Sequence, residues 1–162
     1  MHYLFERLAI SAALELENTM STSEMITSTG TQVGSAWVQS AVPLIGRLLI
    51  AAIFLISGYG KIADPAGTIG YIGMVGLPFP VVGYALALLT EIAGGIALVV
   101  GFHTRIVALA LAAFSIATAL VFHNALGDQN QFIHFFKNVA MAGGLLQIVA
   151  FGGGRYSIDA RR

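Results

Sequence analysis

Apolar positions along the chain form four long runs, which begin near residue 41 and follow a more polar N-terminal part. A bilayer core of about 30 Å is crossed by roughly 20 apolar residues in helical form. The pattern therefore predicts an all-α, polytopic membrane protein, with a bundle of four transmembrane helices in residues 41–155. The predicted spans are about 42–60, 80–101, 104–123 and 131–151.

Residues 1–40 predict a polar, partly flexible N-terminal tail. Within it, residues 3–17 set Leu and Ile against Glu and Arg, which predicts a short amphipathic helix. Residues 18–35 are rich in Ser, Thr and Gly and predict a flexible polar stretch. Acidic residues interrupt the apolar run and no basic segment leads into it, so the tail is a poor signal peptide. Residues 156–162 form a basic C-terminal tail.

Proline and short connections set the expected limits of the spans. Pro43 is expected in the first turn of span one, where a proline costs no helical hydrogen bond. The short connection 102–103 forces spans two and three into an antiparallel hairpin. After span one, Asp64 and Pro65 give a helix start signal, which predicts a short interfacial helix over about residues 66–75. A simple connector is favoured here over a lid above a site between the helices.

Composition strengthens the membrane assignment and excludes several functions. The chain is 57% hydrophobic and only 10% charged, with a mean hydropathy of +0.82, whereas soluble domains carry about 25% charged residues. The net charge is zero, so there is no basic excess for a nucleic-acid partner. The absence of cysteine excludes disulfides, thiol redox chemistry and cysteine-held metal or iron–sulfur centres.

The distribution of basic residues predicts the orientation, because positively charged loops stay in the cytoplasm. Two lysines, Lys61 and Lys137, belong to the outer side. The inner side carries Arg7, Arg47, Arg105, Arg155, Arg161 and Arg162. We therefore expect both termini in the cytoplasm.

Glu91 is the clearest candidate for a functional residue. It lies eleven residues after Pro80, roughly 16 Å along a helix and close to the midplane. A charge there costs at least about 2.5–3.5 kcal/mol unless it faces protein or water. Gly83, Ala87 and Gly95 share its helical stripe, and small residues at this spacing allow close helix approach. We expect Glu91 to face a neighbouring helix, and to be protonated if it is unpaired.

Two cations are the expected partners of Glu91. Arg47 in span one and Lys137 in span four each lie roughly 7 Å from Glu91 along the membrane normal. The three residues would form a polar track through the bundle, although snorkelling of Arg47 to the headgroups is an equal alternative. With both cations buried, the positive surplus favours a reduced, partly anionic quinone or another anion. Alternatively, a neutral Lys137 would pass protons with Glu91 and His134.

The start of span four places several polar groups on one helix face. His134, Lys137 and Asn138 share this face, and Phe135 and Phe136 lie beside it. Such donors and rings suit an aromatic, carbonyl-bearing ligand, whereas the alternative is a polar staple between helices. No recognised metal-ligand spacing is present, because the pattern from His123 through Asp128 to His134 is weak. Asp128 or Asn130 is expected to cap span four.

Residues 46–159 resemble the DoxX family of small membrane proteins. The resemblance is carried by Gly46 to Leu49, Ser57 to Lys61, Ala66 to Thr68, Gly76 to Pro78, Glu91 to Gly95, Gln131 to Asn138 and Gly154 to Asp159. It implies a four-helix bundle in the bacterial inner membrane and a link to quinone or thiol-redox complexes, without establishing an enzyme. Arg47, Glu91, His134, Lys137 and Asn138 fall within the family motifs.

The leading hypothesis is a multi-pass, redox-associated subunit that interacts with quinone or with a partner oxidoreductase. Glu91, His134 and Lys137 would transfer protons, and Arg47, Lys137, Asn138 and Phe135 would bind the ligand. A non-catalytic scaffold or assembly subunit is the main alternative, and a small transporter is a weaker one. We expect lipid, a redox partner subunit and a homo-oligomer as partners, with no metal and no built-in cofactor beyond a bound quinone.

Overall fold

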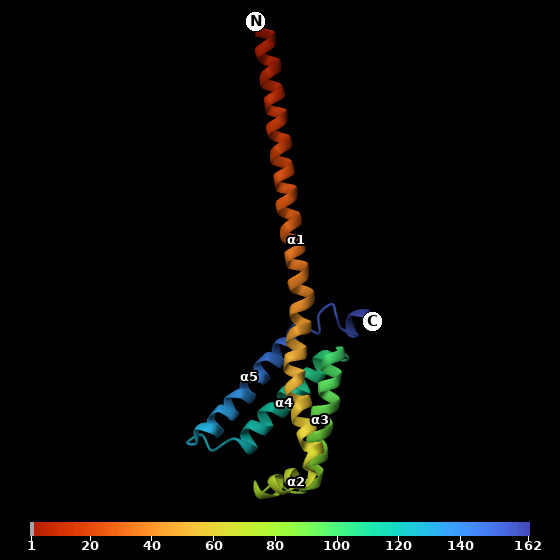
Figure 1. Cartoon of the computed structure of the whole chain (residues 1–162), viewed down its shortest axis with the longest axis vertical. Coiled ribbons are helices and arrows are strands. Elements are labelled where there is room, and N and C mark those ends of the chain that lie inside the picture. Colours follow the sequence, from red (N-terminus) through yellow and green to blue (C-terminus); the bar gives the residue numbers. More distant parts are fainter. Residues whose placement is uncertain (1) are drawn as a thin grey trace. The chain divides into compact units, whose positions relative to one another are not determined.

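The computed structural model describes the helices of residues 2–162, with side chains over residues 14–22 and 37–162. These residues form helices and contain no strand, which confirms the predicted all-α class. The elements in order are α1 (His2–Ala63), α2 (Pro65–Met74), α3 (Pro80–Val100), α4 (Thr104–Phe122), α5 (Gln129–Phe151) and the 3-10 turn η1 (Asp159–Arg161) (Figure 1).

The chain divides into two units, residues 1–39 and residues 40–162. The first unit is helical from residue 2, and this includes residues 18–35, where we expected irregular polar chain. The hydroxyls of Thr19 and Thr22 donate to backbone carbonyls one turn earlier in the same helix. Serine and threonine can therefore remain within a helix, because the helix backbone itself satisfies their hydroxyls.

Helices long and apolar enough to cross a membrane lie where the four spans were predicted, to within a few residues at most of their ends. The helices long and apolar enough to cross a membrane are Trp37–Ala63, Pro80–Val100, Thr104–Phe122 and Gln129–Phe151. Span one differs most, because its helix passes through Pro43 and ends at Ala63. Membrane helices tolerate such an internal proline. Lys61, which we expected in a loop, is therefore the basic residue in the last turn of α1.

Capping residues fix the ends of the shorter helices. Asp64 caps α2 by accepting a hydrogen bond from the Gly67 N–H at 2.9 Å, as its position before Pro65 predicted. Asp128 caps α5 in the same way through the Gln131 N–H. These caps stabilise the start of each helix by about 1 kcal/mol.

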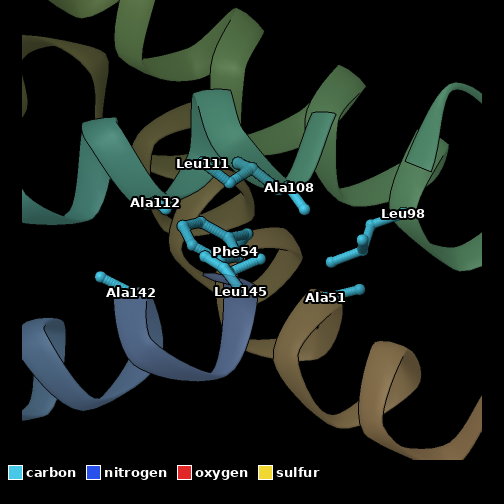
Figure 2. Close-up of a cluster of buried hydrophobic side chains, with 8 residues drawn as sticks. All are labelled: Ala51, Phe54, Leu98, Ala108, Leu111, Ala112, Ala142 and Leu145. Atoms are coloured by element: carbon cyan, nitrogen blue, oxygen red, sulfur yellow. The ribbon is translucent and has the colours of Figure 1, made fainter. Parts of the chain in front are cut away.

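Within residues 40–162, the connections lie at two ends of the bundle (Figure 1). We call the end with α2 and the α4–α5 loop the α2 end. The other end, with the α3–α4 turn and residues 152–162, is the α3–α4 end. The buried hydrophobic core contains residues from α1, α3, α4 and α5 (Figure 2). Its members are Ala51, Phe54, Leu98, Ala108, Leu111, Ala112, Ala142 and Leu145.

Glycine allows α1 and α3 to approach closely. A Cβ atom at Gly95 would lie 2.8 Å from Cδ2 of Leu55, and one at Gly58 would lie 2.6 Å from Cδ1 of Ile92. Both distances are too short for carbon atoms, so a larger residue would require the facing Leu55 or Ile92 side chain to shift. Within the predicted small-residue stripe of α3, Gly95 therefore faces α1 together with Glu91, whereas Gly83 faces Ile72 of α2.

Candidate functional site

A cavity of about 890 Å³ lies at the α2 end and is lined by residues of α1 to α5. Its aromatic wall residues are Phe54, Tyr71, Phe114 and Phe122. Its charged and strongly polar residues include Ser57, Lys61, Asp64, Glu91, Lys137 and Asn138. A largely apolar wall with a few polar groups is typical of small-molecule sites.

α2 contributes directly to this cavity. Gly67, Thr68, Tyr71 and Ile72 line it, and the Tyr71 ring stacks on Phe122 of α4 with centroids 5.6 Å apart. Ile72 is also one of the buried residues of the fold. The segment that we expected to be a connector therefore forms part of the cavity wall.

Glu91 is buried and paired with a cation. Its residue is 4% exposed, and Nζ of Lys61 lies 2.9 Å from both Oε1 and Oε2. The Ser57 hydroxyl donates to Oε1 at 3.1 Å, and the Lys61 ammonium also donates to Ser57 Oγ at 3.0 Å. Oε2 takes no hydrogen bond of good geometry in the described part of the chain. Oε2 has almost no accessible surface and faces the Lys61 ammonium, so the carboxylate is enclosed between α1 and α3.

The predicted track from Arg47 through Glu91 to Lys137 is wrong. Arg47 is fully buried at the α3–α4 end, where its guanidinium donates to the carbonyl oxygens of Leu98 and Tyr156. It does not line the cavity. Lys61, the cation that does pair with Glu91, lies 14 residues after Arg47 on α1, or about 21 Å farther along the helix.

Sequence reasoning missed Lys61 because span one was expected to end at residue 60. The spacing of Ser57 and Lys61, four residues apart on one helix face, was the available signal. It becomes informative only if the helix continues for three further residues, as it does.

The polar cluster of α5 forms partly as predicted. Nζ of Lys137 lies 2.9 Å from Nδ1 of His134, and the Asn138 amide donates to the His134 carbonyl oxygen at 2.9 Å. Lys137 and Asn138 line the same cavity as Glu91, whereas His134 and Phe135 do not. The Phe135 ring instead packs edge-on against Phe136, with centroids 5.4 Å apart.

His123 is a cavity residue that sequence reasoning did not assign to the site. It follows the last residue of α4 and lines the cavity. Its ring stacks on His134 with centroids 5.1 Å apart, and its Nδ1 lies 2.9 Å from Oε1 of Gln131. Only the tertiary arrangement brings the two histidines together, because a loop separates them in sequence. Among the described side chains, no group of three His, Asp or Glu residues is placed to hold a metal ion.

At the α3–α4 end, Asp159 joins the C-terminal segment to α4. Its carboxylate accepts hydrogen bonds from the N–H groups of His103 and Thr104 and from the Thr104 hydroxyl, at 2.9, 2.7 and 2.6 Å. These hydrogen bonds, the Thr104 hydroxyl first among them, hold the pKa of Asp159 below its ordinary value. A carboxylate at a helix N-terminus is also favoured by the helix dipole. These contacts fasten the C-terminal segment to the start of α4, and none of the three residues lines the cavity.

The packing at the same end explains one glycine of the α3–α4 turn. Gly101 ends α3 with a φ of 72°, in the left-handed region that favours glycine. A side chain there would collide with the Arg47 guanidinium and with Ser157. The buried Arg47 side chain therefore leaves room only for glycine at this turn.

Comparisons with known proteins agree on one family. The DoxX family profile matches residues 42–124. The inner membrane protein YqjF of Escherichia coli (strain K12) is 39% identical over 118 residues, covering 72% of this chain and 88% of the relative. The inner membrane protein YphA of the same organism is 33% identical over 123 residues, covering 73% and 88%. No solved structure matches the chain.

Proposed function

Because the chain belongs to the DoxX family, we infer that it is a multi-pass inner-membrane protein whose cavity at the α2 end binds a quinone for a partner oxidoreductase. One observation carries this proposal. The buried Lys61–Glu91 pair lines the same cavity as Lys137 and Asn138. Ionisable side chains inside membrane spans are costly to bury, and those that occur there commonly serve a function.

The cavity supplies what a quinone ring needs. Aromatic residues of α1, α2 and α4 offer flat surfaces for the ring, and offset stacking of this kind contributes about 0.5–1.5 kcal/mol per pair. The Lys137 ammonium is a donor for a ring oxygen, because its contact with His134 uses only one of its three N–H groups. The Lys61 ammonium already contacts both Glu91 oxygens and Ser57, so its proposed role is to hold Glu91. Asn138 adds an amide beside Lys137.

Glu91 is the proposed proton acceptor for a bound quinol. The Glu91 carboxylate would take a hydroxyl proton once its side chain turns toward the ring, and Lys61 would stabilise the ionised form before the transfer. The chain has no cysteine, and none of its side chains is a good two-electron donor. Electrons would therefore pass to or from a partner subunit that carries its own redox group.

A non-catalytic scaffold is the second candidate. The Lys61–Glu91 pair also ties α1 to α3, and a pair of this kind holds two membrane helices together without any ligand. The scaffold requires no bound ring, so ligand binding separates the two proposals.

The test is quinone binding to the full chain in lipid nanodiscs, with empty nanodiscs as the blank. Ubiquinone and menaquinone analogues with short tails are the probes. Ala87→Phe places a ring in the cavity and should weaken binding about tenfold or more, equal to about 1.4 kcal/mol. Ala85→Phe is the matched control, because Ala85 lies on the same helix, is exposed and does not line the cavity.

Two results would count against the proposal. Binding that is equal in the native chain and in Ala87→Phe would place the quinone elsewhere. A native chain that binds no quinone and is recovered with a stoichiometric partner protein would favour the scaffold.

A further inference from the structure

We propose that the α5 side of the cavity is a subsite for an anionic oxygen, so that the site prefers a ring ligand with one ionised hydroxyl over its neutral counterpart. The inference rests on the proposed function and names the ligand class of the same cavity. Deprotonated quinols and hydroxyquinones have this chemistry. It follows from the charges around the cavity and from the partners that those charges already have.

The acids of the cavity are already engaged. Glu91 forms its ion pair with Lys61, so these two charges cancel. Asp64 uses its carboxylate to cap α2 through the Gly67 N–H. Among the described side chains, Lys137 is the remaining lysine, and no carboxylate lies within ion-pair distance of it. The formal charges of the cavity lining cancel, because the capping Asp64 keeps its negative charge. The exposed Lys137 ammonium nevertheless has no acid of the described side chains beside it, so a bound anion would supply its first charged partner.

The position of this charge is fixed by a neutral histidine. An ammonium group can only donate, so His134 Nδ1 accepts the hydrogen bond from Lys137 at 2.9 Å. A nitrogen that accepts carries no proton, so His134 is neutral and does not spread the charge. The same hydrogen bond leaves Lys137 with two further N–H groups for a ligand.

A second histidine supports the first. The amide oxygen Oε1 of Gln131 can only accept, so His123 Nδ1 donates to it. This hydrogen bond fixes the His123 ring, which stacks on His134 at 5.1 Å and forms part of the cavity wall. Gln131, His123 and His134 thus form a chain of contacts that ends on the Lys137 ammonium. His123 acts here as a positioning residue.

The two sides of the cavity differ in charge, and this sets the orientation of the ring. The Lys61–Glu91 side has a carboxylate that repels an anion and a lysine whose N–H groups are already used. The α5 side has an ammonium without an acid and an adjacent amide from Asn138. The ionised oxygen therefore belongs at Lys137.

The experiment compares two probes of nearly equal size with opposite charge behaviour. 2-Hydroxy-1,4-naphthoquinone is ionised at neutral pH, and 2-methoxy-1,4-naphthoquinone is neutral. Binding of each to the full chain in nanodiscs gives a ratio of the two dissociation constants. Native chain should bind the anion about threefold or more tightly than the neutral ring, as expected for a charge pair formed with an exposed ammonium.

Variants assign the preference to Lys137. Lys137→Gln should bring the ratio close to one, while Lys137→Arg retains the charge and should keep the preference. Arg105→Gln is the matched control, because it removes an exposed cation at the α3–α4 end and should leave the ratio unchanged. The ratio compares two ligands on one sample, so a general loss of folded protein does not alter it.

The outcomes distinguish this inference from the proposed function. Tight binding of the anion that is lost in Lys137→Gln supports both. Equal binding of the two rings by the native chain, or an unchanged ratio in Lys137→Gln, overturns the anionic subsite and leaves the quinone cavity standing. Binding of neither ring overturns the quinone cavity, and the subsite with it.

Discussion

Lys61 and Glu91 form a bidentate ion pair between α1 and α3, with Nζ 2.9 Å from each carboxylate oxygen. The lysine side chain is 21% exposed and the glutamate side chain is 6% exposed. The pair thus lies between the surface case, where such contacts stabilise little, and the fully buried case, where an unpaired charge is very costly. Because both residues line the cavity, changes to this contact test its contribution to stability and the proposed ligand binding separately.

Removal of the cation alone should destabilise the protein more than removal of both charges. Lys61→Met leaves the Glu91 carboxylate buried and unpaired, so we expect a loss of about 2 kcal/mol, between the surface and buried values. The double variant Lys61→Met with Glu91→Gln should recover part of this loss. Thermal unfolding in detergent micelles measures the difference. If the single and double variants unfold at the same temperature as the native chain, the pair is not stabilising.

Arg47 should act on stability and leave ligand binding unchanged. Its two hydrogen bonds go to backbone carbonyl oxygens at the α3–α4 end, outside the cavity. Arg47→Lys cannot reproduce the planar fork, so we expect a loss of about 2 kcal/mol in unfolding free energy. Quinone affinity of the remaining folded protein should match the native value. Arg105→Lys, at an exposed position, is the control. Reduced quinone affinity in Arg47→Lys would show that Arg47 contributes to binding.

The cap formed by Asp159 gives a pH-dependent contribution to stability. Its folded-state pKa is lowered, so its contribution is fully present above the ordinary aspartate value of about 3.9 and is lost as the pH falls through the lowered folded value. Asp159→Asn should therefore reduce stability by about 1 kcal/mol at neutral pH. The difference from native should vanish in acid. A difference that persists below a pH of about 2 would contradict this account.

The chain's lack of cysteine allows a clean test of orientation. Gly127 lies exposed in the α4–α5 loop, with no atom within 4 Å of an added Cβ, and Ala160 is exposed in the C-terminal segment. The arginine bias predicts that the α3–α4 end is cytoplasmic. A membrane-impermeant maleimide should therefore label Gly127→Cys in spheroplasts, and Ala160→Cys only after lysis. The reverse pattern would invert the proposed topology.

The close approach of α1 and α3 should be sensitive to a single methyl group. Gly95→Ala places a Cβ 2.8 Å from the Leu55 side chain, and overpacking of this kind costs about 1–3 kcal/mol. Gly143→Ala is the matched control on α5, because no atom lies within 4 Å of its added Cβ. Unfolding in detergent should separate the two variants. Equal stability would show that Leu55 moves aside without cost.

Much of the fold follows from the sequence, because bilayer thickness constrains helix length strongly. The spans, the caps at Asp64 and Asp128 and the small-residue face of α3 were all predictable from local pattern. Pro43 was misleading, because a proline inside a membrane helix resembles a helix start. The wrong start of span one did not affect the core. The predicted end at residue 60, however, placed Lys61 in a loop, whereas it lies in α1.

The site was predictable in its residue types and only partly in its pairings. Glu91, Lys137 and Asn138 were identified from the cost of burying polar groups, and all three line one cavity. Span one was correctly expected to supply a cation to Glu91, but the wrong residue was chosen, because the span was expected to end at residue 60 and Lys61 was left in a loop. Arg47 is held instead by two backbone carbonyl groups, and this contact has no signature in the sequence.

The buried guanidinium of Arg47 has a consequence for biogenesis. One of its acceptors, the Tyr156 carbonyl, comes 109 residues later in the chain. While the ribosome is still producing α2 to α5, the first span already carries a cation with no peptide oxygen from that segment to receive it. During this interval the side chain must extend toward lipid headgroups and water. Closure of the bundle at that end therefore waits until the last of these segments has been translated.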